Sequence, residues 1–198
     1  EQDEYFALGA MVTLRQIETH PGLAAYFGDC IAECVRHIVG VQFRNCATIG
    51  GSIWGRFGFS HPLTLFLSLG AEVVLHKAGV VALADFVNMP YDRDILVEVR
   101  LPKRGQKAAY VTHRASATDF PVLAVAVCRT ADQTVCAVGA RPQRAALVVR
   151  EDGEAAQAFA DRCADTLTFS SNLRGSAEYR AHLCRVLVRR AALAIEED

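Results

Sequence analysis

Apolar residues follow two different spacings along this chain, and the spacing changes from one segment to the next. Short apolar runs bounded by turn residues are typical of strands, whereas apolar residues three or four positions apart indicate helices with one buried face. The helical spacing is clear in residues 23–39, through Leu23, Phe27, Ile31 and Ile38. The mixture of both patterns predicts an α+β protein.

The pattern places strands in both halves of the chain, helices between and after them, and one long glycine-rich loop. The predicted strands are residues 5–10, 71–76, 80–82, 95–101, 109–113, 122–128, 135–139 and 145–149. The predicted helices are residues 14–20, 23–39, 62–69, 153–165 and 176–196, and the glycine-rich loop is residues 45–60. In the last helix, Tyr179, Leu183 and Leu187 are expected to face the sheet, and Arg180 to lie largely off that face.

Residues 102–107 are polar and basic, with the composition of a linker. We therefore expect a domain boundary there, with one domain in residues 1–104 and a second in residues 105–198. The second domain is expected to contain antiparallel strands followed by two helices.

Composition narrows the class of protein. Hydrophobic residues make up 52% of the 198 residues, which excludes a disordered chain, and the net charge is −1, which argues against a nucleic-acid-binding protein. The seven cysteines include no CxxC pair, so buried free thiols are expected rather than disulfides or a metal site. We find no apolar run of membrane-spanning length and no signal peptide, so a cytoplasmic protein without membrane contact is predicted.

The segment with the clearest chemistry is RNCATIGGS, residues 44–52. The adjacent Gly50 and Gly51 remove Cβ clashes, so that consecutive backbone amides can converge on one point. Such a concavity binds anions, phosphate oxygens above all, and the hydroxyl groups of Thr48 and Ser52 add donors. A glycine pair alone is more often a tight turn, and this one matches neither common nucleotide-binding glycine motif.

The longer context is more specific. Residues 38–76 read IVGVQFRNCATIGGSIWGRFGFSHPLTLFLSLGAEVVLH, and DILVEVRLP follows at residues 94–102. Together with GARP at residues 139–142 and GSAEYR at residues 175–180, these segments resemble the flavoprotein (medium) subunits of the molybdenum hydroxylases. That family includes xanthine dehydrogenase, carbon monoxide dehydrogenase and nicotinate dehydrogenase. The resemblance covers nearly the whole chain.

The resemblance implies a partial FAD-binding domain of the vanillyl-alcohol-oxidase (PCMH) type, followed by the C-terminal α+β domain of the carbon monoxide dehydrogenase flavoprotein. It implies that the backbone amides of the loop hold the FAD pyrophosphate, and that two apolar side chains lie near the flavin. The cofactor-binding residues implied in this way are Ile38, Ala47, Thr48, Ile49, Gly50, Gly51, Ser52, His61 and Leu96. Ile38 and Leu96 are equally well explained as core residues, and no catalytic or metal-binding residue is predicted.

The sequence departs from the family pattern in three places. The family's first lobe, which forms the other wall of the FAD site, has no counterpart in the residues before the predicted first strand. His61 stands where the family has an aspartate, and it is equally well explained as the first residue of a helix. A family lysine aligns near Val111 or Thr112, which leaves Arg114 or Lys107 as the replacement cation.

The implied function is to pass electrons, through bound FAD, from iron–sulfur clusters to NAD or another acceptor. Molybdopterin would be carried by a large partner subunit and the iron–sulfur clusters by a small one. This reading makes the chain the FAD-binding subunit of a xanthine dehydrogenase-like oxidoreductase. The alternative is a non-catalytic assembly subunit of the same complex that has lost FAD.

Overall fold

The computed structural model describes residues 1–197 and contains two four-stranded antiparallel sheets. The first sheet has the order β1-β4-β2-β3 and the second the order β5-β6-β7-β8. The strands are β1 (Tyr5–Gly9), β2 (Glu72–Leu75), β3 (Gly79–Ala82), β4 (Leu96–Pro102), β5 (Lys107–His113), β6 (Leu123–Arg129), β7 (Thr134–Gly139) and β8 (Ala146–Val149). The helices are α1 (Leu14–Glu18), α2 (Pro21–Phe27), α3 (Cys30–Val35), α4 (Val41–Cys46), α5 (Ile49–Trp54), α6 (His61–Ser68), α7 (Leu83–Phe86), α8 (Ala156–Thr166) and α9 (Ala177–Glu197).

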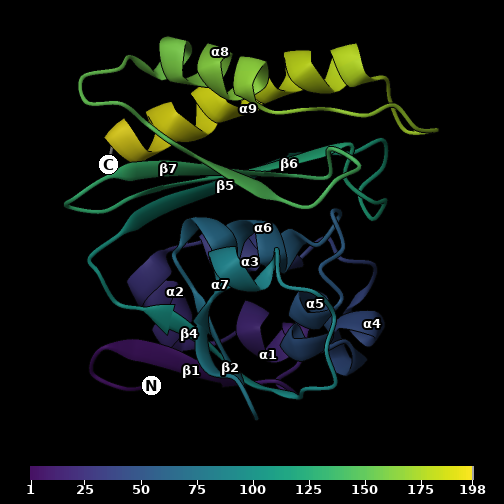
Figure 1. Ribbon diagram of the computed structural model, residues 1–198, viewed down its shortest axis with the longest axis vertical. Coiled ribbons are helices and arrows are strands. Elements are labelled where there is room, and N and C mark those ends of the chain that lie inside the picture. The colour runs from purple at the N-terminus through teal and green to yellow at the C-terminus, as the bar shows by residue number, and fades with distance from the viewer. Residues whose placement is uncertain (198) are drawn as a thin grey trace.

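The second sheet is covered on both faces. Helices α8 and α9 lie on the outer face, and α6 and α3 lie against the inner face, between the two sheets (Figure 1). Alternate residues of a strand point to opposite faces, and in β6 both sets are buried because each face has its own helical layer. One hydrophobic cluster forms under α8 and α9, and a larger one extends from the first sheet through α6 to the inner face of the second sheet.

Helix α6 is the element shared by both sheets. Ser60 caps its first turn by accepting a hydrogen bond from the backbone amide of Leu63, and all eight residues of the helix are buried. The second sheet packs so closely against α6 that a Cβ at Gly139, the last residue of β7, would collide with the Thr64 hydroxyl. The backbone amide of Ala140 donates to the carbonyl oxygen of Gly58 at 2.6 Å. The division of the chain between residues 104 and 105 stays a prediction, because one hydrophobic cluster crosses it.

The strand predictions are confirmed within two residues at each end, but one helix prediction and one loop prediction are wrong. Residues 23–39 do not form one helix, because Gly28 adopts a φ of 63° between α2 and α3, a conformation that ends a helix. Residues 45–60 are not a loop throughout. They contain the end of α4 and all of α5, which Thr48 caps through a hydrogen bond from the amide of Gly51 at 3.2 Å.

The surface of α9 also differs from the prediction. Arg180 is 1% exposed rather than solvated, whereas Tyr179 is exposed. The Arg180 guanidinium donates to the carbonyl oxygens of Val122 and Ser170, at 2.9 and 2.7 Å, and to Asn172 Oδ1 at 2.6 Å. It therefore ties the start of α9 to β6 and to the segment before the helix.

All seven cysteines are free, and Cys46 is exposed while the others are buried. Among the helices of residues 1–197, none is both long and apolar enough to cross a membrane. Among the side chains of residues 1–196, no group of three or more His, Cys, Asp or Glu could hold a metal ion.

Candidate functional site

A cavity of about 370 Å³ opens between the start of α5, the segment after α3 and the start of α6. It brings together residues that lie far apart in the chain, from Leu14 to Phe120, since Thr118, Asp119 and Phe120 close one side. Most of the cofactor-binding residues implied by the resemblance line this cavity: Ile38, Ala47, Thr48, Gly51, Ser52 and His61.

The remaining three predicted residues do not line the cavity. Ile49 and Gly50 are fully buried, and Leu96 is 8% exposed and paired with Leu75 in the first sheet. The amides of Ile49 and Gly50 donate to the carbonyl oxygens of Val12 and Ala10, both at 2.9 Å.

The predicted amide cradle must therefore be corrected. Two of its amides anchor α5 to the segment that follows β1, and they are not directed at a ligand. The Ser52 amide donates within the chain as well, to the carbonyl oxygen of Thr48 at 3.2 Å. The Thr48 amide makes no hydrogen bond within the residues that the structure describes, and the Gly51 amide meets only the Thr48 hydroxyl. The donors that remain for a ligand are the backbone amides of Thr48 and Gly51, because the Ser52 hydroxyl donates to the carbonyl oxygen of Thr48 at 3.1 Å.

The two glycines have different structural roles. A Cβ at Gly50 would stand 2.6 Å from the Ala10 carbonyl oxygen and 2.9 Å from the Ala10 Cβ, so the fold itself requires glycine there. A Cβ at Gly51 would meet only Thr48 Oγ1, at 3.5 Å, and otherwise open space. Because Gly51 lines the cavity, its missing side chain leaves room for a ligand rather than for a protein atom.

His61 lies at the start of α6 and reaches the cavity while being only 7% exposed. Its Nδ1 is 2.6 Å from the Tyr110 hydroxyl. Burial lowers the pKa of His61 to about 4, and the charge of Arg114 contributes in the same direction. His61 is therefore neutral at pH 7. The Tyr110 hydroxyl donates to Nδ1 in the arrangement that leaves the proton on Nε2, so the imidazole presents a donor on its other side. His61 begins helix α6, as one reading of the sequence predicts, and it also lines the cavity, while its contact with a cofactor stays a prediction.

Arg114 supplies positive charge beside the cavity. Its charge lowers the pKa of His37, after burial, and contributes to the lowered pKa of His61, and both histidines line the cavity. Lys107, the other replacement cation considered from the sequence, is exposed and lies at the opposite end of β5, where it pairs with Arg129. Of the two replacement cations, Arg114 is thus the one near the cavity, although it is not among the lining residues.

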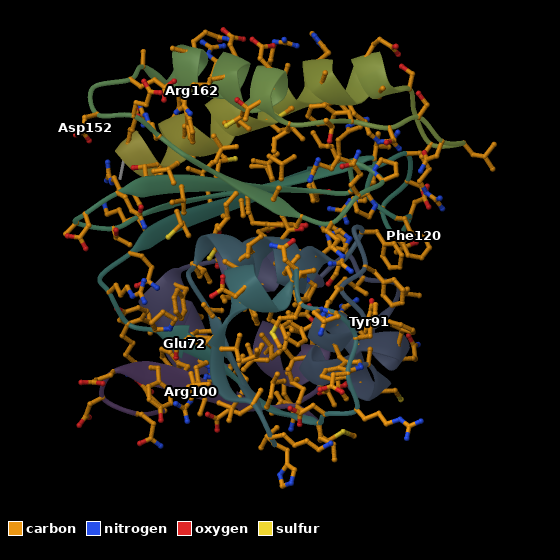
Figure 2. All side chains as sticks on the ribbon, viewed as in Figure 1. Glu72, Tyr91, Arg100, Phe120, Asp152 and Arg162 are labelled. Carbon is orange, nitrogen blue, oxygen red and sulfur yellow. The ribbon has the colours of Figure 1, made fainter. Side chains whose placement is uncertain are left out.

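Aromatic rings form the outer wall. Phe57 and Phe59 stack with centroids 5.2 Å apart and an interplanar angle of 6°, and Phe59 meets Phe120 edge-on at 4.7 Å. All three are about half exposed. Trp54, from the same glycine-rich segment, instead packs on Phe86 with a centroid distance of 5.8 Å, as a local core residue does. In Figure 2, Phe120 and Tyr91 lie along the same edge of the molecule.

This combination fits one part of a flavin dinucleotide. Backbone amide donors with a nearby guanidinium suit a pyrophosphate, and the apolar side chains of Leu14, Ile38 and Val39 suit a planar ring system. The volume is at the small end of the range for ligand pockets, so the cavity accommodates a portion of an extended dinucleotide rather than all of it.

Sequence reasoning missed several lining residues. The cavity is also lined by His37, Phe43, Thr118 and Phe120. Tyr110 forms a hydrogen bond with Nδ1 of His61. No local motif marks these residues, because the fold brings them together from separate segments.

Comparison with known proteins gives consistent matches. Residues 1–104 match the family model described as the FAD binding domain in molybdopterin dehydrogenase. The nicotine 6-hydroxylase medium subunit of Paenarthrobacter nicotinovorans is 29% identical, and the carbon monoxide dehydrogenase medium chain of Hydrogenophaga pseudoflava is 27% identical. Each alignment covers 96% of this chain and 75% of the relative.

Solved structures show the same fold. Quinoline 2-oxidoreductase from Pseudomonas putida 86 superposes with a TM-score of 0.85 at 22% identity, covering 100% of this chain and 76% of that one. Reconstituted CO dehydrogenase from Oligotropha carboxidovorans superposes with a TM-score of 0.87 at 22% identity, covering 100% of this chain and 77% of that one. The α+β architecture predicted from the sequence is thereby confirmed as that of a carbon monoxide dehydrogenase flavoprotein.

Proposed function

Because this chain belongs to the family of FAD-binding domains in molybdopterin dehydrogenases, we propose that it is the flavin-carrying medium subunit of a molybdenum-dependent hydroxylase or dehydrogenase. The observation that carries the proposal is the cavity beside α5. It gathers Thr48, Gly51 and Ser52 at one end, with His61 beside them and the Arg114 charge nearby.

Each of these groups has a distinct task in the proposal. The amides of Thr48 and Gly51 donate to the pyrophosphate, and Arg114 offsets its negative charge. His61 donates from Nε2 and stays neutral across the physiological pH range, because its pKa is lowered to about 4 by burial. Ile38 and its apolar neighbours exclude water from the ring system. Leu96 remains a predicted flavin contact, on the first sheet.

When bound, FAD supplies the redox chemistry, and the protein supplies binding, orientation and electrostatics. Electrons would arrive from the iron–sulfur clusters of a small subunit, which receives them from molybdopterin in a large subunit, and would leave to NAD or another acceptor. The word "medium" in the names of both relatives supports an assembly with a larger and a smaller chain.

Two finer predictions remain part of the proposal. Buried free thiols support a reducing compartment, and we place the protein in the cytoplasm. The xanthine dehydrogenase-like character remains a sequence prediction, since the relatives above are named for nicotine and carbon monoxide.

The test is to purify the tagged protein from its native host and measure flavin and subunit content. We expect about one flavin per copy of this chain and co-purification with one larger and one smaller chain that carry molybdopterin and iron–sulfur clusters. Flavin-free protein that still assembles would favour the alternative of an assembly subunit, which the occupied amides of Ile49 and Gly50 support. A protein with neither flavin nor partners would refute both.

A further inference from the structure

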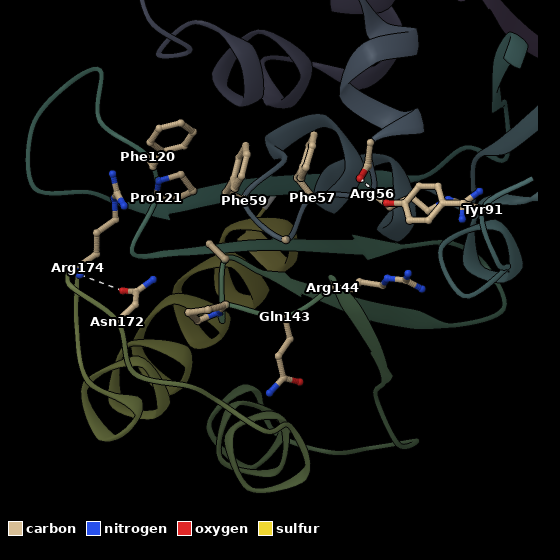
Figure 3. A pocket seen from close by; sticks show the side chains of 14 residues that line it. Arg56, Phe57, Phe59, Tyr91, Phe120, Pro121, Gln143, Arg144, Asn172 and Arg174 are labelled. Carbon is tan, nitrogen blue, oxygen red and sulfur yellow. Dashed lines mark hydrogen bonds between the residues drawn. The ribbon is translucent and has the colours of Figure 1, made fainter. Parts of the chain in front are cut away.

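A second cavity, of about 440 Å³, lies on the other side of the stacked Phe57 and Phe59 rings. It is formed by the loop before α6, the segment before β6, the turn between β7 and β8 and the segment before α9. Three arginines line it, and we call it the arginine pocket after Arg56, Arg144 and Arg174. Figure 3 shows Arg56 and Arg144 on one side of the two phenylalanine rings and Arg174 with Phe120 on the other.

The arginine pocket carries uncompensated positive charge. No aspartate or glutamate is among its lining residues. Arg174 has a carboxylate partner, Asp119, at 3.4 Å, but among the side chains of residues 1–196 neither Arg56 nor Arg144 has a carboxylate within 4.0 Å. The charge of Arg144 also contributes to lowering the pKa of Arg56, after burial, which indicates that the two cations are close.

Arg56 is the more unusual of the two. It is 4% exposed, and its guanidinium lies 4.0 Å from the Phe86 ring centroid and 4.6 Å from that of Tyr91. Its Nε is buried without a hydrogen-bond partner among the described residues. Buried charges are normally paired, so a buried guanidinium that has an unsatisfied hydrogen-bond donor indicates a missing counter-ion.

A purely structural role explains part of this arrangement. Arg56 Nη1 donates to the carbonyl oxygen of Met89 and Arg144 Nη1 to that of Val87, both at 2.6 Å. These contacts satisfy carbonyl groups just after α7, as arginines commonly do at helix ends. Each contact uses one donor of a guanidinium that has five, and neither neutralises its charge.

The rest of the lining indicates what the anion is attached to. Phe57, Phe59 and Tyr91 are each 44–62% exposed, and a cluster of exposed aromatic rings is typical of a binding surface. The volume is far larger than an inorganic ion requires and lies within the range of small-molecule sites. Guanidinium groups bind phosphate in a bidentate way, and aromatic faces stack on planar rings.

We propose that the arginine pocket binds a phosphate-bearing ligand with a planar ring, of the nucleotide class, separately from the flavin cavity. The phosphate lies at Arg56 and Arg144, and the ring lies against Phe57. The two cavities share Phe57, Phe59 and Phe120 as lining residues, so the second ligand is separated from the first by an aromatic layer.

The test is calorimetric titration of the protein, as purified with its accompanying subunits and saturated with FAD, with adenosine 5′-monophosphate. Adenosine and inorganic phosphate are titrated separately. We expect the monophosphate to bind about tenfold or more tightly than either part alone, because ring and phosphate contribute together. Equal binding of adenosine and the monophosphate would overturn the assignment of the arginines, and the absence of binding would overturn the site.

Arg144→Gln is the variant of choice, because Arg144 is exposed and the structural contact of its side chain is one hydrogen bond, to the carbonyl oxygen of Val87. We expect it to weaken monophosphate binding about tenfold or more, the effect of removing a charged hydrogen-bond donor, and to leave FAD affinity unchanged. Arg189→Gln, on the exposed side of α9, is the matched control and should change neither. Arg144→Gln protein that binds the monophosphate normally would refute the proposal.

Competition separates this inference from the proposed function. Monophosphate binding that persists at saturating FAD supports two sites, whereas displacement of FAD by the monophosphate would show that the arginine pocket is the end of the flavin site. If the protein binds the monophosphate through Arg144 but takes up no FAD, the arginine pocket stands and the flavin proposal fails.

Discussion

Gly50 and Gly51 are adjacent, yet the structure predicts opposite effects for the same substitution. In Gly50→Ala the new methyl group stands 2.6 Å from the carbonyl oxygen of Ala10, which is also the acceptor of the Gly50 amide. Overpacking of this kind costs about 1–3 kcal/mol, and the weakened hydrogen bond adds about 1 kcal/mol. We expect the melting temperature to fall by roughly 4–16 °C for a chain of this size.

In Gly51→Ala the methyl group meets no atom closer than Thr48 Oγ1, at 3.5 Å. Alanine is favoured over glycine inside a helix by about 0.5–1 kcal/mol, so the melting temperature should stay the same or rise by roughly 1–4 °C. Flavin binding should weaken nonetheless, because the methyl group enters the space that the pyrophosphate needs. The loss of one charge-assisted hydrogen bond corresponds to about 10- to 150-fold in dissociation constant.

The assay measures thermal unfolding and FAD affinity on the same preparations, after removal and re-addition of FAD to the protein with its accompanying subunits. Affinity is measured well below both melting temperatures, so that unfolding does not lower the apparent binding. Gly50→Ala serves as the matched control, with the same added methyl group one residue away. A Gly51→Ala protein that binds FAD as tightly as the wild type would refute the assignment of this cavity to the pyrophosphate.

Three further outcomes are expected. The pKa of His61 is lowered to about 4 in the native state. Between about pH 6.5 and pH 4, His61 is therefore protonated in the unfolded chain but neutral in the native protein. Stability should therefore fall by about 3 kcal/mol between pH 6.5 and pH 4. His61→Asn keeps a hydrogen-bonding group near the Tyr110 hydroxyl but does not titrate, so its free energy of unfolding in denaturant should not show that part of the decline. A pH profile unchanged from that of the wild type would contradict the burial of His61. Arg180→Gln should cost about 3–5 kcal/mol, because it leaves buried carbonyl oxygens unpaired; a loss below 1 kcal/mol in urea unfolding would show that water replaces the guanidinium. Gly139→Ala should destabilise the protein through its collision with the Thr64 hydroxyl, and Thr64→Ala in the same chain should restore most of the loss, as a double-mutant cycle would measure.

The sequence predicted the strands well because each is a compact apolar run bounded by turn residues, as in β6 and β7. It failed where tertiary contacts decide the local conformation. Helix α5 has six residues and contains two glycines, so its local propensity is poor. It forms because Thr48 caps it and because the amides of Ile49 and Gly50 find acceptors in the segment after β1.

The candidate site was predictable in part for the same reason. The RNCATIGGS motif identified Thr48, Gly51 and Ser52, which line the cavity, from the sequence alone. The partners of those residues are set by long-range contacts that no local pattern encodes. Tyr110, which holds His61, lies 49 positions further along the chain. The sequence wrongly predicted that Arg180 is exposed. Helical spacing indicates which face a residue occupies, but it does not show that a neighbouring segment offers carbonyl acceptors to its side chain.

The burial of α6 between both sheets limits how this protein can be recombined with its relatives. A chimera joined after residue 104 would keep α6 from one parent and receive the facing sheet from the other. The chimera would fold only if the second parent also has a glycine at the position of Gly139, opposite Thr64. Parents that differ at this contact should yield insoluble hybrids, whereas a crossover that transfers α6 along with β6 and β7 should preserve the fit.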